Sequence, residues 1–79
     1  MAAARRQIFA DRCRRAEPVV TRAVERGELP AGTDPVRVLS TLAAPIHFQL
    51  LVTGEPVDER TADQSAAVTL AAARAGALT

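Results

Sequence analysis

The sequence predicts an all-α fold: three helices in an antiparallel helical bundle that is completed by dimerisation. Glycine and proline divide the 79 residues into three segments, each long enough for a helix, and none alternates like a strand. Hydrophobic residues make up 48% of the chain, which is typical of a globular protein. A chain this short buries only about 60–65% of its unfolded surface. We therefore expect a single domain over residues 1–79 whose core needs a partner.

The first helix is expected over about residues 3–26. Its apolar face carries five residues at spacings of four, three, four and three: Phe9, Cys13, Ala16, Val20 and Ala23. Arginines, among them Arg5 and Arg12, are assigned to the other faces. Gly27 suits the left-handed position that ends a helix. Pro18 lacks an N–H group, so a kink or a break is predicted there.

The second helix is expected over residues 35–53. Asp34 can cap its free N–H groups, and Pro35 fits the first helical position. Between Val38 and Val52 the sequence carries no charged residue, so this helix needs burial on nearly every side. Pro45 removes a backbone donor and is predicted to bend the helix.

The third helix is expected over residues 58–75, and its inner face is made of small side chains. Small faces let two helix axes approach closely, which favours a helix–helix interface over a bulky core. We predict a homodimer in which this face and the apolar second helix meet their symmetry mates. The predicted interface residues are Leu39, Leu42, Ala43, Ile46, Leu50, Ala62, Ala66, Thr69, Leu70 and Ala73.

Four residues of the first two helices are candidates for binding a small molecule: Phe9, Cys13, His47 and Phe48. Together they would form an apolar wall with one imidazole, which is the usual make-up of a ligand pocket. In the alternative interpretation they close up into ordinary core, with His47 bonded to a neighbouring carbonyl and Cys13 acting as a small buried hydrophobe. The sequence leaves both interpretations open.

Several functional classes find no support in the sequence. One His and one Cys do not make a tetrahedral zinc site, and no glycine-rich loop is present to cradle a cofactor phosphate. Ser40 and His47 lie roughly 10 Å apart along one helix, too far for a nucleophile–base hydrogen bond. We therefore expect neither a metal, nor a cofactor, nor enzymatic activity.

Charge and composition also limit the partners. A net charge of +1 makes no electrostatic case for nucleic acid or an anionic membrane. No apolar run is expected to approach the roughly 20 residues of a membrane span. The first residues carry no apolar stretch of a secretory signal, and the single Cys13 cannot form an internal disulfide. A cytoplasmic protein is the expectation.

The order of short motifs adds a resemblance to a known family. An Arg-Gly-Glu-Leu turn at 26–29 is followed by Asp-Pro at 34–35 and by Thr-Gly-Glu-Pro at 53–56. This order resembles the C-terminal region of tetracycline-repressor-like (TetR-type) transcriptional regulators over roughly residues 5–76. The chain departs from that pattern at four positions, which are Ala44 in place of Gly, His47 and Phe48 in place of two Tyr, and Gln49 in place of Arg.

The resemblance implies the dimerisation and effector-sensing domain of a transcriptional repressor. In such regulators the last two helices pair with their two-fold mates, and the preceding helix helps to wall a cavity for an effector, here an apolar small molecule. A helix-turn-helix domain ahead of these elements binds operator DNA and is absent from this chain, so the chain alone is not expected to bind nucleic acid. The alternative is an autonomous helical homodimeric interaction module with no DNA-binding partner domain.

Overall fold

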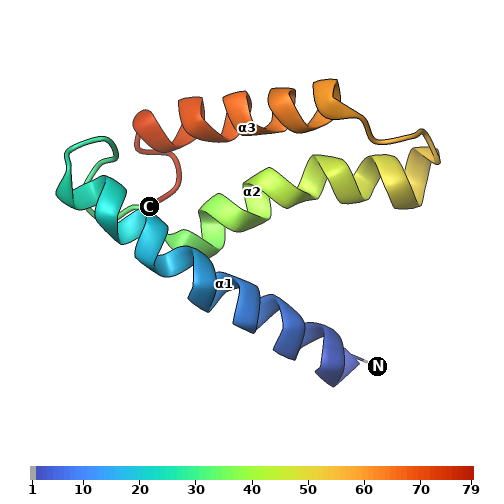
Figure 1. Ribbon diagram of the computed structural model, residues 1–79, viewed down its shortest axis with the longest axis horizontal. Helices are drawn as coiled ribbons and strands as arrows, with labels where there is room; N and C mark the ends of the chain where they lie inside the picture. Colours follow the sequence, from blue (N-terminus) through green and yellow to red (C-terminus); the bar gives the residue numbers. More distant parts are fainter. Residues whose placement is uncertain (1) are drawn as a thin grey trace.

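The computed structural model describes residues 2–79 and is entirely helical apart from its connections (Figure 1). Its elements are α1 (Ala2–Glu25), α2 (Pro35–Phe48), a short π-helix η1 (Gln49–Thr53) and α3 (Glu59–Arg74). The described residues contain no strand. The predicted all-α class and its three helices are therefore confirmed, and the bounds agree to within one residue when η1 is counted with α2.

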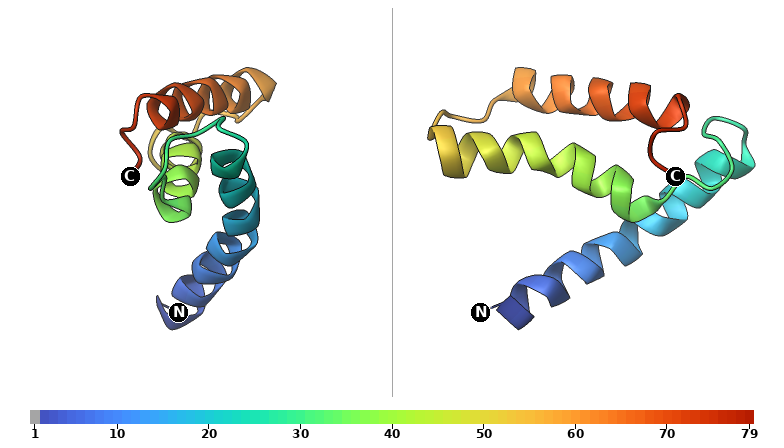
Figure 2. Two further views of the ribbon diagram at one scale, coloured as in Figure 1. Left: turned by 90° about the vertical axis from the view of Figure 1, so that its left-hand side faces the viewer. Right: turned by 180° about the vertical axis from the view of Figure 1, so that it is seen from behind.

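The helices form a hairpin with one diverging arm. α2 and α3 run antiparallel, side by side, and α2 packs against both other helices (Figures 1 and 2). Only the C-terminal half of α1 lies against the start of α2, and its N-terminal half points away from the hairpin. The radius of gyration is 13.5 Å, against about 11.6 Å for a compact chain of this length. The chain is therefore extended for its size.

Helix α1 passes through Pro18 without interruption, so the break predicted as one outcome there does not occur. Proline has a backbone φ close to the helical value, so its cost is one lost hydrogen bond and crowding of a preceding carbonyl. Pro18 is exposed, so water can reach the carbonyl that has lost its partner. Figure 2 shows α1 curved rather than broken.

The ends of the helices follow the caps predicted for them. Asp34 accepts a hydrogen bond from the Val36 N–H at 3.0 Å, which starts α2. Gly27 has a φ of 77°, and the Glu28 N–H donates to the Ala23 carbonyl at 2.9 Å. This six-to-one bond past a left-handed glycine is a Schellman motif, and it satisfies a carbonyl that the helix end leaves free.

Helix α2 continues through Pro45 and widens into η1, which ends at Gly54 with a φ of 71°. By length and composition alone, the 19 residues Pro35–Thr53 suffice to cross a membrane. The expectation that no apolar run approaches that length is therefore wrong. A core helix of a soluble protein passes the same test, so the finding is weak evidence about membranes.

The core is small and partly polar. Its buried apolar residues are Cys13, Val20, Ala73 and Leu78. Ser65, which is also buried, donates its hydroxyl to the Leu42 carbonyl and so ties α3 to α2. The Asp34 N–H donates to the Leu78 carbonyl at 2.8 Å and holds the C-terminal turn against the loop before α2.

Candidate functional site

The single chain leaves an unusually large area uncovered. Its accessible surface is 5916 Å², whereas a folded monomer of this mass exposes about 4600 Å². The difference, about 1300 Å², exceeds the roughly 800 Å² that each partner buries in a standard interface. The large hydrophobic side chains that remain exposed are Ile8, Phe9, Val19, Val36, Phe48, Leu50, Leu51, Val52, Val68 and Leu70.

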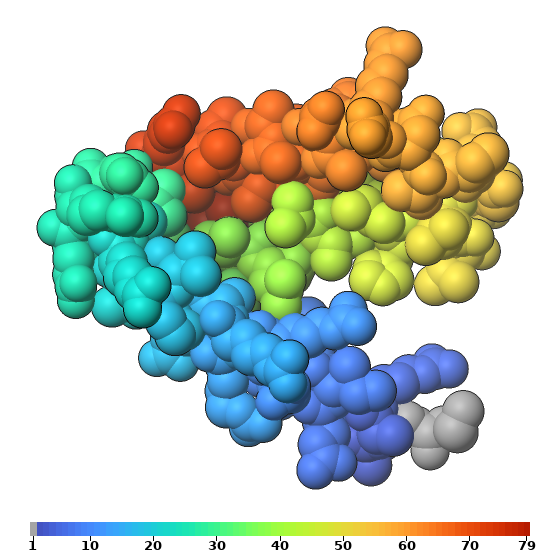
Figure 3. Space-filling view, in the orientation of Figure 1, coloured from blue at the N-terminus to red at the C-terminus, as the bar shows by residue number. Residues whose placement is uncertain are grey.

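Four of these side chains are close together in sequence, from the end of α2 through η1. We call Phe48, Leu50, Leu51 and Val52 the hairpin tip; their exposed fractions are 58%, 54%, 80% and 67%. Figure 3 shows this segment in yellow at the end of the hairpin remote from the C-terminus of α1. A run of apolar side chains this exposed is typical of a surface that meets another molecule.

The structure divides the ten predicted interface residues into three groups. Thr69 and Ala73 are buried inside the chain. The half-buried residues are Leu39, Leu42, Ala43 and Ile46, and the exposed residues are Leu50, Ala62, Ala66 and Leu70. Ala62, Ala66 and Leu70 recur every four residues, so they form one row along the surface of α3 beside its buried face. We call them the α3 row.

The four candidate ligand residues do not all meet. Phe9 and His47 line one hollow of about 350 Å³ between α1 and α2, together with Arg5, Ile8 and Arg12. Cys13 is 8% exposed and belongs to the core. Phe48 points elsewhere, because consecutive residues of a helix are turned by about 100° and His47 already faces the hollow.

His47 has a defined tautomer on geometric grounds. Its Nδ1 lies 3.0 Å from the Ala43 carbonyl oxygen, one turn earlier on α2. A carbonyl oxygen only accepts hydrogen bonds, so in the neutral ring Nδ1 carries the proton and Nε2 is left as an acceptor. The imidazole is exposed at the edge of the hollow, with its Nε2 available to solvent or ligand.

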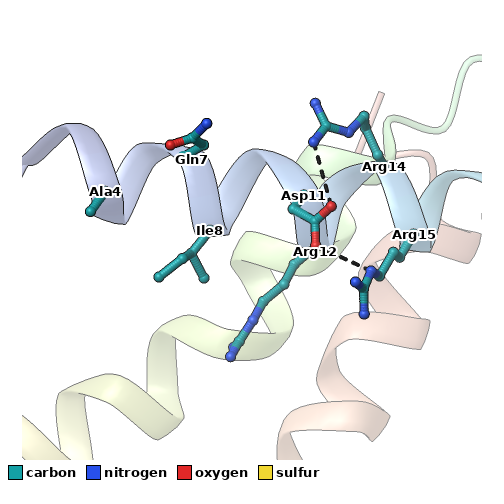
Figure 4. A pocket seen from close by; sticks show the side chains of 7 residues that line it. All are labelled: Ala4, Gln7, Ile8, Asp11, Arg12, Arg14 and Arg15. Atoms are coloured by element: carbon teal, nitrogen blue, oxygen red, sulfur yellow. Dashed lines mark hydrogen bonds and ion pairs between the residues drawn. The ribbon is translucent and has the colours of Figure 1, made fainter.

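A second hollow, of about 470 Å³, runs along α1 alone (Figure 4). Asp11 lies at its centre and pairs with Arg14 at 3.4 Å and with Arg15 at 3.1 Å. All seven lining residues belong to one helix, so no second element closes the space. The hollow between α1 and α2 is the better ligand candidate because two elements wall it.

Side-chain hydrogen bonds of Gln49 close the turn between η1 and α3. The Gln49 side-chain amide donates to the Pro56 carbonyl at 2.6 Å, and its oxygen accepts from the Thr61 hydroxyl at 3.3 Å. Asp58 caps α3 by accepting from the Thr61 N–H at 3.0 Å, and this hydrogen bond lowers the pKa of the Asp58 carboxyl. Gln49 therefore has a structural role, which the sequence alone did not indicate.

Phe9 has three neighbours in the hollow that were not expected from the sequence: Arg5, Ile8 and Arg12. The assignment of both arginines to other faces is wrong, since all three residues line the hollow with Phe9. Their spacing contains the signal, because residues three and four apart on a helix share a face. Among residues 2–79, no group of three or more His, Cys, Asp or Glu side chains is placed to hold a metal ion.

Comparison with known protein families gives a match over most of the chain. The family model described as "Tetracyclin repressor-like, C-terminal domain" matches residues 1–69. No curated protein matches the chain. No solved structure matches it either.

Proposed function

This chain belongs to the tetracycline-repressor-like C-terminal domain family, and on that premise we propose that it is the dimerisation and effector-sensing domain of a transcriptional repressor. The DNA-binding part of the repressor lies outside this chain. Domains of this family are regulatory rather than enzymatic, and they generally form dimers and bind effectors. The partners proposed are therefore a second copy of the chain and a small molecule.

The observation that carries the proposal is the uncovered apolar area. Burial of about 800 Å² per chain, as in a standard interface, would remove more than half of the roughly 1300 Å² excess. At about 25 cal/mol per Å² of apolar area, covering these side chains is the main free energy available for association. A second copy supplies that cover without any other partner.

The proposed contact surface consists of the α3 row and the half-buried residues of α2, which are Leu39, Leu42, Ala43 and Ile46. Ala62 and Ala66 present only methyl groups, so a partner helix can approach α3 closely, and Leu70 provides a larger side chain at the end of the row. Leu50, at the hairpin tip, extends the same apolar surface along η1. Thr69 and Ala73 are buried within each chain, so they support this surface indirectly by packing α3 against α2.

Effector sensing is proposed to act through α1. Its N-terminal half diverges from the hairpin (Figure 1), and the hollow is lined by side chains of that half and of α2. A ligand that binds there favours one separation of α1 and α2 over others, and it shifts the population toward that arrangement. In a repressor, such a shift changes the spacing of the two DNA-binding domains and releases the operator.

The test of dimerisation is the mass in solution. Light scattering at micromolar concentration is expected to give twice the chain mass of 8.4 kDa. A stable monomer at that concentration would contradict the proposal. A helix-turn-helix encoded immediately before Met1 would separate this function from the alternative of an autonomous interaction module, which predicts the same dimer.

A further inference from the structure

We propose that the hollow between α1 and α2 binds an amphiphilic organic anion, that is, a small molecule with an apolar body and one carboxylate. The inference rests on the effector-sensing role proposed above and gives the chemical class of the effector. It is carried by the apolar side chains that line the hollow and by the positive charges around it.

The apolar body has a place against Ile8 and Phe9. These side chains are 57% and 42% exposed, so both keep a large apolar area that nothing in the chain covers. The hollow, of about 350 Å³, falls in the range of small-molecule sites, which begin at roughly 300 Å³. A chain of about eight carbons fits that space, and its burial against two apolar side chains is favourable.

The charge of the lining is positive only. Arg5 and Arg12 border the hollow, and no acidic side chain lines it. Asp11 takes Arg14 and Arg15 instead, and in the part of the chain that the structure describes, neither Arg5 nor Arg12 forms an ion pair. Two unpaired guanidinium groups beside an apolar wall are complementary to an apolar anion.

Arg12 extends toward α2 and is the arginine best placed to meet the anion (Figure 4). Arg12 and Ile8 extend from the side of α1 that faces α2, whereas Arg14 extends from the other side. A guanidinium can hold both oxygens of a carboxylate at once, which a single ammonium cannot do in the same geometry. We assign Arg12 as the partner of the carboxylate, and Arg5, two turns earlier, as a source of additional positive potential.

His47 is a boundary of the site and not the partner of the anion. Its Nδ1–H is engaged by the Ala43 carbonyl, so neutral Nε2 offers only an acceptor, which a carboxylate does not favour. The ring nevertheless lines the hollow, and it is the only histidine in the chain. Its proton resonances therefore report occupancy without ambiguity.

The experiment compares three probes of equal chain length on the full chain: octanoate, octanol and octylamine, each below its aggregation concentration. Titration is followed by the His47 imidazole signals and by calorimetry. Octanoate is expected to give saturable shifts of those signals, with a dissociation constant at least tenfold lower than that of octanol. Octylamine is expected to bind more weakly still, because its charge repels the arginines.

Two variants test the assignment against one matched control. Arg12→Gln is expected to weaken the binding of octanoate about tenfold and to leave the binding of octanol unchanged. Phe9→Ala is expected to weaken the binding of both probes. Arg22→Gln removes an arginine from the same helix at a position outside the hollow, and it should leave both affinities unchanged.

The outcomes separate this inference from the proposed function. Equal affinity for octanol and octanoate would contradict the proposal that the effector is an anion, and it would indicate a neutral apolar effector. Binding of neither probe, or loss of octanoate binding in Arg22→Gln, would overturn the inference, while the mass in solution still decides on dimerisation.

Discussion

At the scale of single residues, two adjacent valines of α1 have opposite surroundings. Val20 is 6% exposed and Val19 is 63% exposed. Val20→Ala is expected to lower the free energy of unfolding by about 1–2 kcal/mol, because it removes buried methyl groups from a small core. Val19→Ala should change it by less than about 0.5 kcal/mol. Urea denaturation of both variants at one protein concentration measures the difference; equal losses would contradict the burial assigned to Val20.

The spacing of residues predicts which side chains of α1 share a face, but not which part of that face stays uncovered. Cys13 and Val20 are buried at the predicted spacing, because a regular helix fixes which residues share a face. Phe9, on the same face, stays exposed, because it belongs to the N-terminal half of α1, which diverges from α2. The position at which α1 and α2 separate depends on their tertiary packing. The periodicity of residues within one helix does not predict that position.

At the scale of the helices, the cap of α3 gives a pH-dependent contribution to stability. Hydrogen bonds from Thr61 lower the pKa of Asp58 below its ordinary value of 3.8. The carboxylate of Asp58 therefore contributes its full stabilisation of the folded chain above pH 3.8. This contribution is lost as the pH falls through the lowered pKa that Asp58 has in the folded state. Asp58→Asn keeps an acceptor for the Thr61 N–H but does not titrate.

Thermal unfolding of the two proteins across the acid range checks this contribution. The difference in Tm between the native chain and Asp58→Asn is expected to be constant above about pH 5 and to shrink as the carboxyl is protonated. A difference that grows on acidification would show that the carboxylate does not stabilise the cap. Asp58→Ala, which lacks the acceptor altogether, is expected to have the lowest Tm at neutral pH.

Pro18 is a local cost that α1 tolerates. Proline within a helix costs about 3 kcal/mol relative to alanine, of which about 1 kcal/mol is offset by the stiffer unfolded chain. Because Pro18 is exposed and the helix is unbroken, Pro18→Ala is expected to raise the free energy of unfolding by about 1–2 kcal/mol. Chemical denaturation tests this; a loss of stability would mean that the proline shapes the packing of α1 on α2.

The bounds of the helices were predictable from local chemistry, whereas the π-helical segment was not. Asp34 with Pro35, and glycines at left-handed positions, set the ends through interactions within a few residues. The segment Gln49–Thr53 contains no residue that requires five-residue hydrogen-bond spacing. Its Gln49 is hydrogen-bonded to Pro56 and Thr61, across the turn to the next helix, and these contacts are not contained in the helical pattern.

At the scale of the whole molecule, the large uncovered area was predictable from the sequence, and its position on the helices only in part. Chain length and alanine content limit how much surface one copy can bury, and the exposed area agrees with that limit. The row of small residues on α3 was assigned to a single face. The structure shows that this face is divided, since Thr69 and Ala73 lie against the chain's own core while Ala62 and Ala66 remain free.

That division provides the sharpest test of the dimer. Ala66→Glu places a charged side chain in the α3 row, where a partner would bury it without a counter-charge, at a cost of several kcal/mol. It is expected to give monomers by light scattering while the helical circular dichroism of the chain is retained. Ala73→Glu is a poorer choice, because Ala73 is 2% exposed and a charge there would disrupt the chain itself.

Ala67→Glu is the matched control, since Ala67 is exposed on α3 and is turned by about 100° from Ala66, away from the row. It introduces the same charge into the same helix at the adjacent position, and it is expected to leave the mass of the dimer unchanged. If both variants dimerise as the parent does, α3 lies outside the interface. The hairpin tip, where Leu51 is 80% exposed, would then be the next surface to test, and Leu51→Glu would be the variant expected to separate the two copies.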